Sequence, residues 1–166
     1  MDIFDEEIIL FWKTLQDNVV KYIMVGGYAA NLHGYQRYTG DMDIWLEDTP
    51  ENRKNFRRAY HIYTGTDFFM IETMQFVPGF SNLWLNNGMT LDIMVGMKGL
   101  EMYTFDECLQ VVQIAEIDGV TVNFLHINHL IANKKAVNRD KDKLDVINLE
   151  KIKKLQEEAA QTPPTL

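Results

Sequence analysis

Two aspartates separated by one residue, Asp41 and Asp43, are the first chemically informative feature of this 166-residue chain. On a β-strand, side chains two residues apart point to the same face, so the two carboxylates would lie side by side while Met42 and Ile44 point into the core. Like charges at that distance repel and raise each other's pKa unless a cation neutralises them. The pair therefore suggests a site for Mg²⁺ or Mn²⁺, although paired aspartates are also common on solvated surfaces.

A third carboxylate, Asp92, stands within the otherwise apolar run 90–95. A buried carboxylate without a partner is energetically costly, so this side chain needs either a partner or solvent. A strand beside that of Asp41 would bring Asp92 to the same cation, whereas a half-exposed sheet would leave it facing water. The residues alone leave both alternatives open.

The diglycine Gly26-Gly27 follows the apolar run 22–25, which predicts a short buried strand, and precedes a predicted helix over residues 28–33. Without side chains the backbone can approach an anion closely, and the N–H groups at a helix N-terminus attract phosphate. A tight turn or a close packing contact is the alternative explanation of the pair.

Hydrophobic periodicity and turn residues predict alternating helices and strands around these groups. The predicted helices cover residues 5–17, 28–33, 50–61, 127–137 and 140–160. The predicted strands cover residues 22–25 and 41–47 and two hairpins, 83–85 with 91–95 and 111–117 with 120–125. We therefore expect an α+β fold, a small mixed β-sheet with helices packed on it, as a single domain over residues 1–160 with a disordered tail over 161–166.

The order of these features resembles the signature of the DNA polymerase β superfamily of nucleotidyltransferases: a Gly-Gly or Gly-Ser pair, a short helix, and Asp-x-Asp. The stretch VGGYAANLHGYQRYTGDMDIWLE is similar to that signature, and Arg37 and Thr39 match a common form found in its small members. One departure is that the family often has Ser after the first Gly, which supplies a hydroxyl to phosphate. Gly27 leaves only backbone donors at that place.

The segment LIANKKAVNRDKDKLDVINL resembles a second stretch of the abortive-infection type and related minimal nucleotidyltransferases, in which a Lys, an Arg and an Asp-x-x-Asp run lie on paired helices. The matching residues here are Lys134, Arg139, Asp142 and Asp145. The resemblance covers about residues 20–150 and implies a polymerase β-like nucleotidyltransferase fold. Residues 50–85 carry no recognisable motif.

The resemblance implies a metal-dependent displacement on a nucleoside triphosphate, with Mg²⁺ or Mn²⁺ as cofactor. It assigns catalytic roles to Asp41, Asp43, Asp92 and Lys134, and nucleotide contacts to Gly26, Gly27, Arg37, Thr39 and Arg139. The three aspartates would bind the metal, and Asp92 could also accept the proton of an attacking hydroxyl. The acceptor, whether small molecule, RNA or protein, is not readable. Among the small members of the superfamily, the chain most resembles toxin–antitoxin components.

Composition excludes several other classes of protein. A net charge of −8 argues against nucleic-acid binding through a general positive field. The basic residues of the last third are compatible with a local basic surface, and we favour the alternative of a solvated helical face. Cys108 is the only cysteine, which fits a reducing compartment. We find neither a basic signal-peptide region nor an apolar run of membrane-spanning length, so we expect a cytoplasmic protein without a membrane partner.

Two other functions compete with that of an active nucleotidyltransferase. A catalytically silent module that binds a nucleotide or a protein partner would keep the same fold, although the presence of all three aspartates favours catalysis. A glycosyltransferase that holds Mn²⁺ and a sugar nucleotide with Asp-x-Asp normally needs a larger nucleotide-binding half before the acidic pair, and the 40 residues that precede Asp41 argue against it. A partner protein or a homodimer that completes the acceptor site is a further hypothesis, since no large second domain is predicted.

Some conspicuous side chains are interpreted as structural. His33, at the end of the predicted short helix, is expected to be a structural histidine rather than an acid or base. Trp45 and Trp84 are expected to fill the core.

Overall fold

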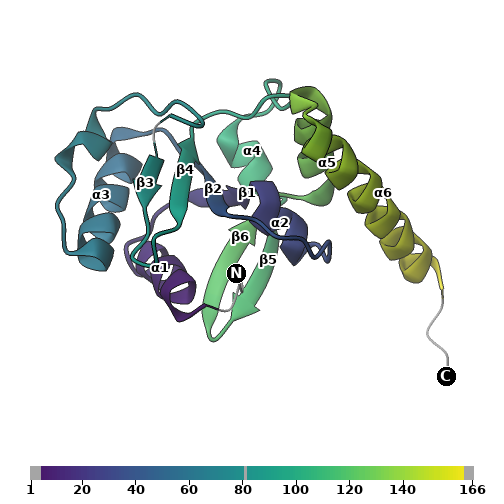
Figure 1. Cartoon of the computed structure of the whole chain (residues 1–166), viewed down its shortest axis with the longest axis horizontal. Coiled ribbons are helices and arrows are strands. Elements are labelled where there is room, and N and C mark those ends of the chain that lie inside the picture. Colours follow the sequence, from purple (N-terminus) through teal and green to yellow (C-terminus); the bar gives the residue numbers. More distant parts are fainter. Residues whose placement is uncertain (1–4, 81, 163–166) are drawn as a thin grey trace.

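A mixed sheet forms the centre of the molecule in the computed structural model, which describes residues 5–80 and 82–162 (Figure 1). Its six strands within these residues follow the order β3-β4-β2-β1-β6-β5. They are β1 (Tyr22–Val25), β2 (Asp41–Leu46), β3 (Asn82–Trp84), β4 (Thr90–Met94), β5 (Gln113–Ile117) and β6 (Val120–Phe124). Strand β2 is parallel to β4 and β1 is parallel to β6, while the other neighbours are antiparallel. The predicted α+β class and both predicted hairpins are confirmed.

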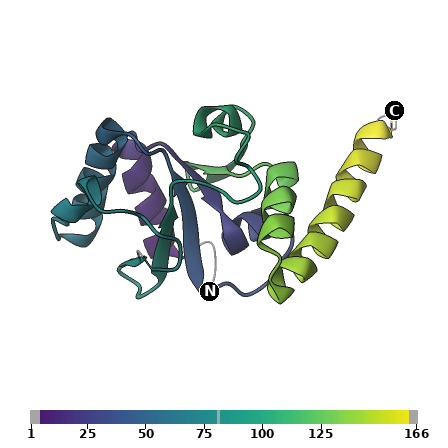
Figure 2. The same cartoon turned by 90° about the horizontal axis from the view of Figure 1, so that it is seen from above.

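Helices pack around this sheet, with α1 and α3 at one end of the molecule and α5 and α6 at the other (Figure 1). They are α1 (Glu6–Asp17), α2 (Gly26–Leu32), α3 (Pro50–Thr64), α4 (Phe105–Leu109), α5 (Ile127–Val137) and α6 (Asp140–Gln161), with a 3₁₀ turn η1 (Phe69–Glu72). The second half of α6 extends away from the rest of the fold (Figure 2). In the described part of the chain, no helix combines the length and the hydrophobicity that a membrane span requires.

The five predicted helices are found, with two informative differences. Helix α2 begins at Gly26, two residues before the predicted start, so the diglycine forms its first turn. Helix α4 was missed because it has only five residues, although Thr104 and Glu107 form a capping box that the sequence spells out. The proposed tail falls largely on residues 163–166, which lie outside the described residues.

The hydrophobic core forms on both sides of the central strands. All four residues of β1 are buried, as expected for a strand covered on both faces. On β2, Met42 and Ile44 are fully buried, which confirms their predicted inward direction. Trp45 packs edge-on against Phe105 of α4. The prediction for Trp84 was wrong: it is 60% exposed, whereas Leu83 and Leu85 on either side are buried, because successive side chains of a strand point to opposite faces of the sheet.

Hydrogen bonds of Asn52 connect α3 to the end of the sheet opposite to that of Asp41 and Asp43. Its side chain is buried and accepts a hydrogen bond from the Lys21 N–H (2.8 Å). It also donates to the carbonyls of Lys21 and Glu47, both at 2.9 Å. One amide thus satisfies three backbone groups where β1 begins and β2 ends.

We expect Asn52→Ala to lower the free energy of unfolding by about 2 to 4 kcal/mol, because three backbone groups lose their buried partner. Urea unfolding monitored by circular dichroism measures this loss. Asn55→Ala on the same helix is the matched control, since Asn55 makes only a 3.4 Å contact to the Val19 carbonyl and one contact to Arg58. Equal losses for the two variants would contradict the assignment.

Candidate active site

One cavity of about 410 Å³ gathers every residue that the sequence analysis proposed for the site. These residues are Gly26, Gly27, Arg37, Thr39, Asp41, Asp43, Asp92, Lys134 and Arg139. They come from the start of α2, the loop before β2, the strands β2 and β4, helix α5 and the turn between α5 and α6. Segments that are far apart in the sequence therefore converge on one cavity. Their roles in binding and catalysis stay predictions.

The pairing of β2 with β4 brings the aspartates together. In this parallel pair Asp43 lies opposite Asp92, and Asp41 lies opposite Thr90. Neighbouring residues across a ladder, and residues two apart along a strand, share one face of the sheet. All three carboxylates therefore face the cavity, while the alternate residues of both strands are buried in the core. Of the two alternatives for Asp92, the structure shows the one in which it lies beside the acidic pair.

Negative charge accumulates on this face, and the pKa values of Asp43 and Asp92 are raised. Burial first, then the charges of Asp92 and Asp41, raise the pKa of Asp43 from 3.8 to about 7, while Lys134 and Lys141 act in the opposite direction. Burial is also the main cause that raises the pKa of Asp92, and a hydrogen bond from Gly79 opposes it. The site therefore holds carboxylates that lack full compensation by positive charge.

The chemistry of these donors fits a hard divalent cation. The arrangement is nevertheless not a finished ligand set: within the described residues, no three Asp, Glu, His or Cys side chains are disposed to hold a metal ion. Asp92 instead accepts the N–H of Gly79 through both carboxylate oxygens, each at 3.0 Å. Mg²⁺ or Mn²⁺ binding by the three aspartates remains a prediction.

The diglycine is required by close packing. Gly26 has φ of +66°, and a Cβ added there would lie 2.0 Å from Asp43 Oδ2. A Cβ on Gly27 would lie 2.5 Å from Thr39 Oγ1. The packing explanation of the pair therefore holds, because the two side chains rest directly on the first turn of α2. Contact with phosphate at this turn is not tested and remains a prediction.

A buried network of ion pairs forms the opposite wall. Asp145 of α6, with a side chain only 1% exposed, pairs with Lys134 Nζ at 2.5 Å. It also pairs with Arg37, Nε to Oδ1 at 2.8 Å, and accepts a hydrogen bond from Nη2 at 2.8 Å. Asp142, equally buried, accepts hydrogen bonds from Arg139 and lies 3.7 Å from Lys134. Two carboxylates thus hold three cations at the edge of the cavity.

Several contributors to the site were missed or misread from the sequence. Asp142 and Asp145 were matched to the family segment without a role, and they act here as anchors for the cations. Lys141 lines the cavity, so the basic stretch is not only a solvated face. The solvated interpretation does fit Lys135 and Lys143, which form exposed ion pairs with Glu150 and Asp140. Sequence could not separate these lysines, because one helical turn decides which of them face the cavity.

His33 is structural, as predicted. Its ring is buried, Nε2 lies 2.8 Å from the Leu125 carbonyl oxygen, and the ring packs edge-on against Phe124. Burial is the main cause that lowers the pKa of this histidine. It therefore joins α2 to the end of β6 in the neutral form.

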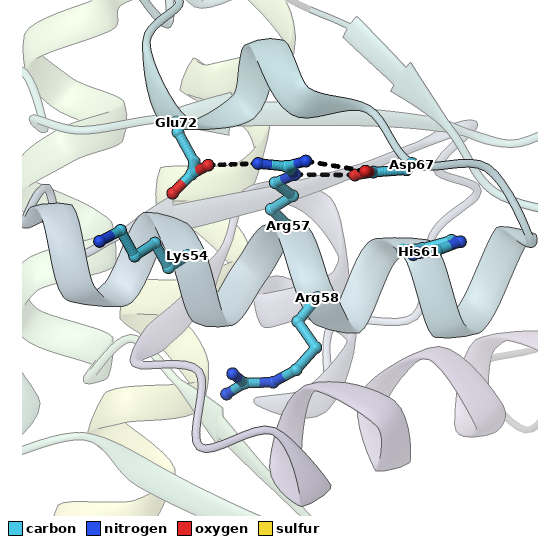
Figure 3. A pocket seen from close by; sticks show the side chains of 6 residues that line it. All are labelled: Lys54, Arg57, Arg58, His61, Asp67 and Glu72. Carbon is cyan, nitrogen blue, oxygen red and sulfur yellow. Dashed lines mark hydrogen bonds and ion pairs between the residues drawn. The ribbon is translucent and has the colours of Figure 1, made fainter.

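A separate cavity on α3, of about 290 Å³, contains none of the proposed site residues (Figure 3). Its lining residues are Lys54, Arg57, Arg58, His61, Asp67 and Glu72. Arg57 forms two hydrogen bonds to Asp67, both at 2.7 Å, and a further one to Glu72. Figure 3 shows the arginine held between the two carboxylates. We interpret this cluster as the connection between α3 and the segment 65–72, because its central cation is already neutralised.

The mixed sheet, the diglycine turn and the three facing aspartates define a protein of the nucleotidyltransferase class. The chain belongs to the family described as "Nucleotidyl transferase of unknown function (DUF2204)", whose model matches residues 5–162. Curated proteins include no significant match to this sequence.

Two solved structures share the fold. A protein of Thermotoga maritima that is named as a nucleotidyltransferase is 17% identical, with a TM-score of 0.54 over 92% of this chain and 89% of that chain. An antigenic nucleotidyltransferase-like protein from Paracoccidioides brasiliensis is also 17% identical, with a TM-score of 0.51 over 85% of this chain and 72% of that chain. At this identity the likeness shows the fold alone.

The raised pKa of Asp43 makes a prediction for the metal-free protein. A carboxyl whose pKa is higher in the folded state stabilises the fold at acid pH, and this contribution is lost as pH rises through about 7. Asp43→Asn removes the charge, so in chelator at pH 8 we expect the variant to be more stable than wild type by about 1 to 3 kcal/mol. Urea unfolding from pH 5 to pH 8 measures the difference, which should shrink toward pH 5. A variant that is less stable at pH 8 would show that the charge is compensated.

The ion-pair network makes a second prediction. Asp145→Asn removes the buried counter-charge of Arg37 and the closer of the two buried carboxylates that pair with Lys134, so the free energy of unfolding should fall by about 3 kcal/mol. Asp140→Asn is the matched control on the same helix, because Asp140 is exposed and pairs only with Lys143. The control should cost less than about 1 kcal/mol. Chemical unfolding in the same buffer measures the free energy of unfolding of both variants. Similar losses for the two would contradict the anchoring role of Asp145.

Proposed function

We propose that this protein transfers a nucleoside monophosphate from a nucleoside triphosphate to a hydroxyl acceptor, with the help of a divalent metal. The observation that carries the proposal is the opposition of charges across one cavity. Asp41, Asp43 and Asp92 face it from β2 and β4, and the cations around Lys134 face it from α5 and α6. A polyanion and the metal that accompanies it need both kinds of charge.

The cationic wall suits the triphosphate. Three positive side chains share two buried carboxylates, so positive charge remains for an incoming anion. In the proposed reaction, Lys134 neutralises the charge that develops on the transferred phosphate. Its two carboxylate partners hold the ammonium in place, which limits it to one position at the cavity and reduces the cost of orientation. Lys141 adds a further positive charge at the rim.

The aspartates supply the other half of the reaction. The hydroxyl oxygen of the acceptor forms a bond to the α-phosphorus, and the bond from that phosphorus to the oxygen bridging to the β-phosphate breaks. Pyrophosphate leaves with the bonding electron pair, and Asp92 accepts the proton of the hydroxyl. Its raised pKa makes this carboxylate a better proton acceptor than an ordinary aspartate.

When bound by Asp41, Asp43 and Asp92, Mg²⁺ or Mn²⁺ would neutralise the carboxylates and stabilise negative charge on the entering and leaving oxygens. The support for this metal is the charge of the donor set and the raised pKa of Asp43. The N–H of Gly79 donates a hydrogen bond to both carboxylate oxygens of Asp92 and so gives this side chain a defined position.

The biological setting is part of the same proposal. The resemblance to the abortive-infection type supports a toxin–antitoxin component that uses ATP or another triphosphate. The single cysteine, Cys108, is buried, which agrees with a reducing, cytoplasmic compartment. The acceptor site would be completed by a partner protein or a second copy of the chain.

The proposal predicts release of pyrophosphate from a nucleoside triphosphate in the presence of Mg²⁺ or Mn²⁺. Asp92→Asn should lower the rate by about 100-fold or more, because it removes the proton acceptor and a metal ligand. Asp106→Asn, on the exposed first turn of α4, is the control and should leave the rate unchanged. Coupled pyrophosphate detection with each of the four triphosphates measures the reaction. Tight triphosphate binding without any release would favour the catalytically silent module instead.

A further inference from the structure

A second, less polar chamber adjoins the proposed active site. Its volume is about 300 Å³, and it shares Asp43, Asp92 and Lys134 with the polar cavity described above. Its own walls come from the end of β4, the segment after it, and helix α5. The two chambers therefore meet at the carboxylates.

The walls of the two chambers differ in chemistry. The side chains found only in the second chamber are mainly apolar: Val25, Pro78, Met94, Met97 and Val137. Asn133 and Lys98 are the polar exceptions. The first chamber is lined by glycines and mainly by arginine, lysine, threonine and aspartate side chains, with Tyr38 as its one aromatic residue. Sites for the organic part of a ligand are mostly apolar with few polar groups, whereas phosphates need cations and N–H donors.

The wall formed by α5 and the segment after β4 is held in place before any ligand arrives. Asn133 Nδ2 donates to the carbonyl of Lys98 at 2.9 Å. Gly99 has φ of +86°, and a Cβ added there would lie 2.8 Å from Ala136 Cβ and 2.9 Å from the Ala132 carbonyl oxygen. The segment therefore packs directly on α5, and the chamber is preformed.

We infer that the second chamber binds the nucleoside end of the triphosphate, while its phosphates lie in the polar cavity. This inference rests on the proposed function. Arg37, Thr39 and Lys141 line only the polar cavity, which therefore suits the phosphates better, whereas a base has apolar faces that Met94, Met97 and Val137 of the second chamber can cover. The α-phosphate then lies where the chambers meet, next to Asp43 and Asp92, which is where the proposed reaction needs it.

Gly96 offers a way to fill this chamber without disturbing the fold. It lines the chamber, its φ is not positive, and a Cβ added there meets no atom within 4 Å. We therefore use Gly96→Leu, together with Val137→Phe on the α5 side as a second filling variant. Gly40→Leu is the matched control, because Gly40 lines only the polar cavity and its added Cβ makes no contact closer than 3.4 Å.

The experiment compares two kinds of ligand by calorimetric titration in Mg²⁺: each of the four nucleoside triphosphates, and inorganic tripolyphosphate. Both filling variants should bind the triphosphate that wild type prefers about tenfold or more weakly, and tripolyphosphate within about twofold of wild type. Gly40→Leu should weaken both ligands, because it narrows the phosphate side. Thermal unfolding of each variant verifies that it is folded.

The outcomes separate this inference from the proposed function. Unchanged triphosphate affinity in Gly96→Leu and Val137→Phe would overturn the nucleoside assignment, and so would equal weakening of triphosphate and tripolyphosphate. In both cases the proposed function would stand, because wild type still binds the triphosphate. Wild-type protein that binds no triphosphate at all would overturn the proposed function itself, and this inference with it.

Discussion

The concentration of negative charge on one face of β2 and β4 is the constraint on which the rest of the site depends. Asp43 and Asp92 are neighbours in a parallel ladder, and Asp41 stands two residues before Asp43 on the same face. Such an arrangement is unfavourable by itself, as the raised pKa of Asp43 shows. The surrounding structure accommodates it: the first turn of α2 has no side chain where Asp43 rests, and cations stand across the cavity.

Positive side chains are concentrated on the opposite wall of the cavity, and their mutual repulsion must also be compensated. Lys134, Arg37 and Arg139 approach one another because Asp142 and Asp145 lie between them. Buried ion pairs of this kind add little net stability, since the loss of hydration offsets most of their attraction. What they provide is position. Asp145 joins helix α6 to α5 and to the loop that leads into β2, so the cations and the aspartates are held in one frame.

Much of the fold follows from local patterns in the chain. The apolar run 22–25, the alternation on β2, and the turn residues of both hairpins predicted the correct elements, because each pattern matches the period of its strand. The predicted start of α3 at residue 50 is also correct, and the side chain of Thr49 caps the helix there. Local patterns failed where an element was too short or depended on its neighbours. Helix α4 has five residues, and Trp84 is exposed because it points to the face of the sheet opposite to that of the buried Leu83 and Leu85.

The residue pattern alone picked out side chains that line the cavity: the diglycine and the acidic pair through their type and spacing, and Lys134 and Arg139 through the resemblance to a known family. How these residues meet depends on tertiary contacts. The register of β2 on β4 places Asp92 beside Asp43, and a shift of one residue would turn its side chain to the opposite face. The helical phase of α6 decides that Asp142 and Asp145 are buried while Asp140 is exposed. Such choices depend on contacts between distant segments, and no local pattern of residues encodes them.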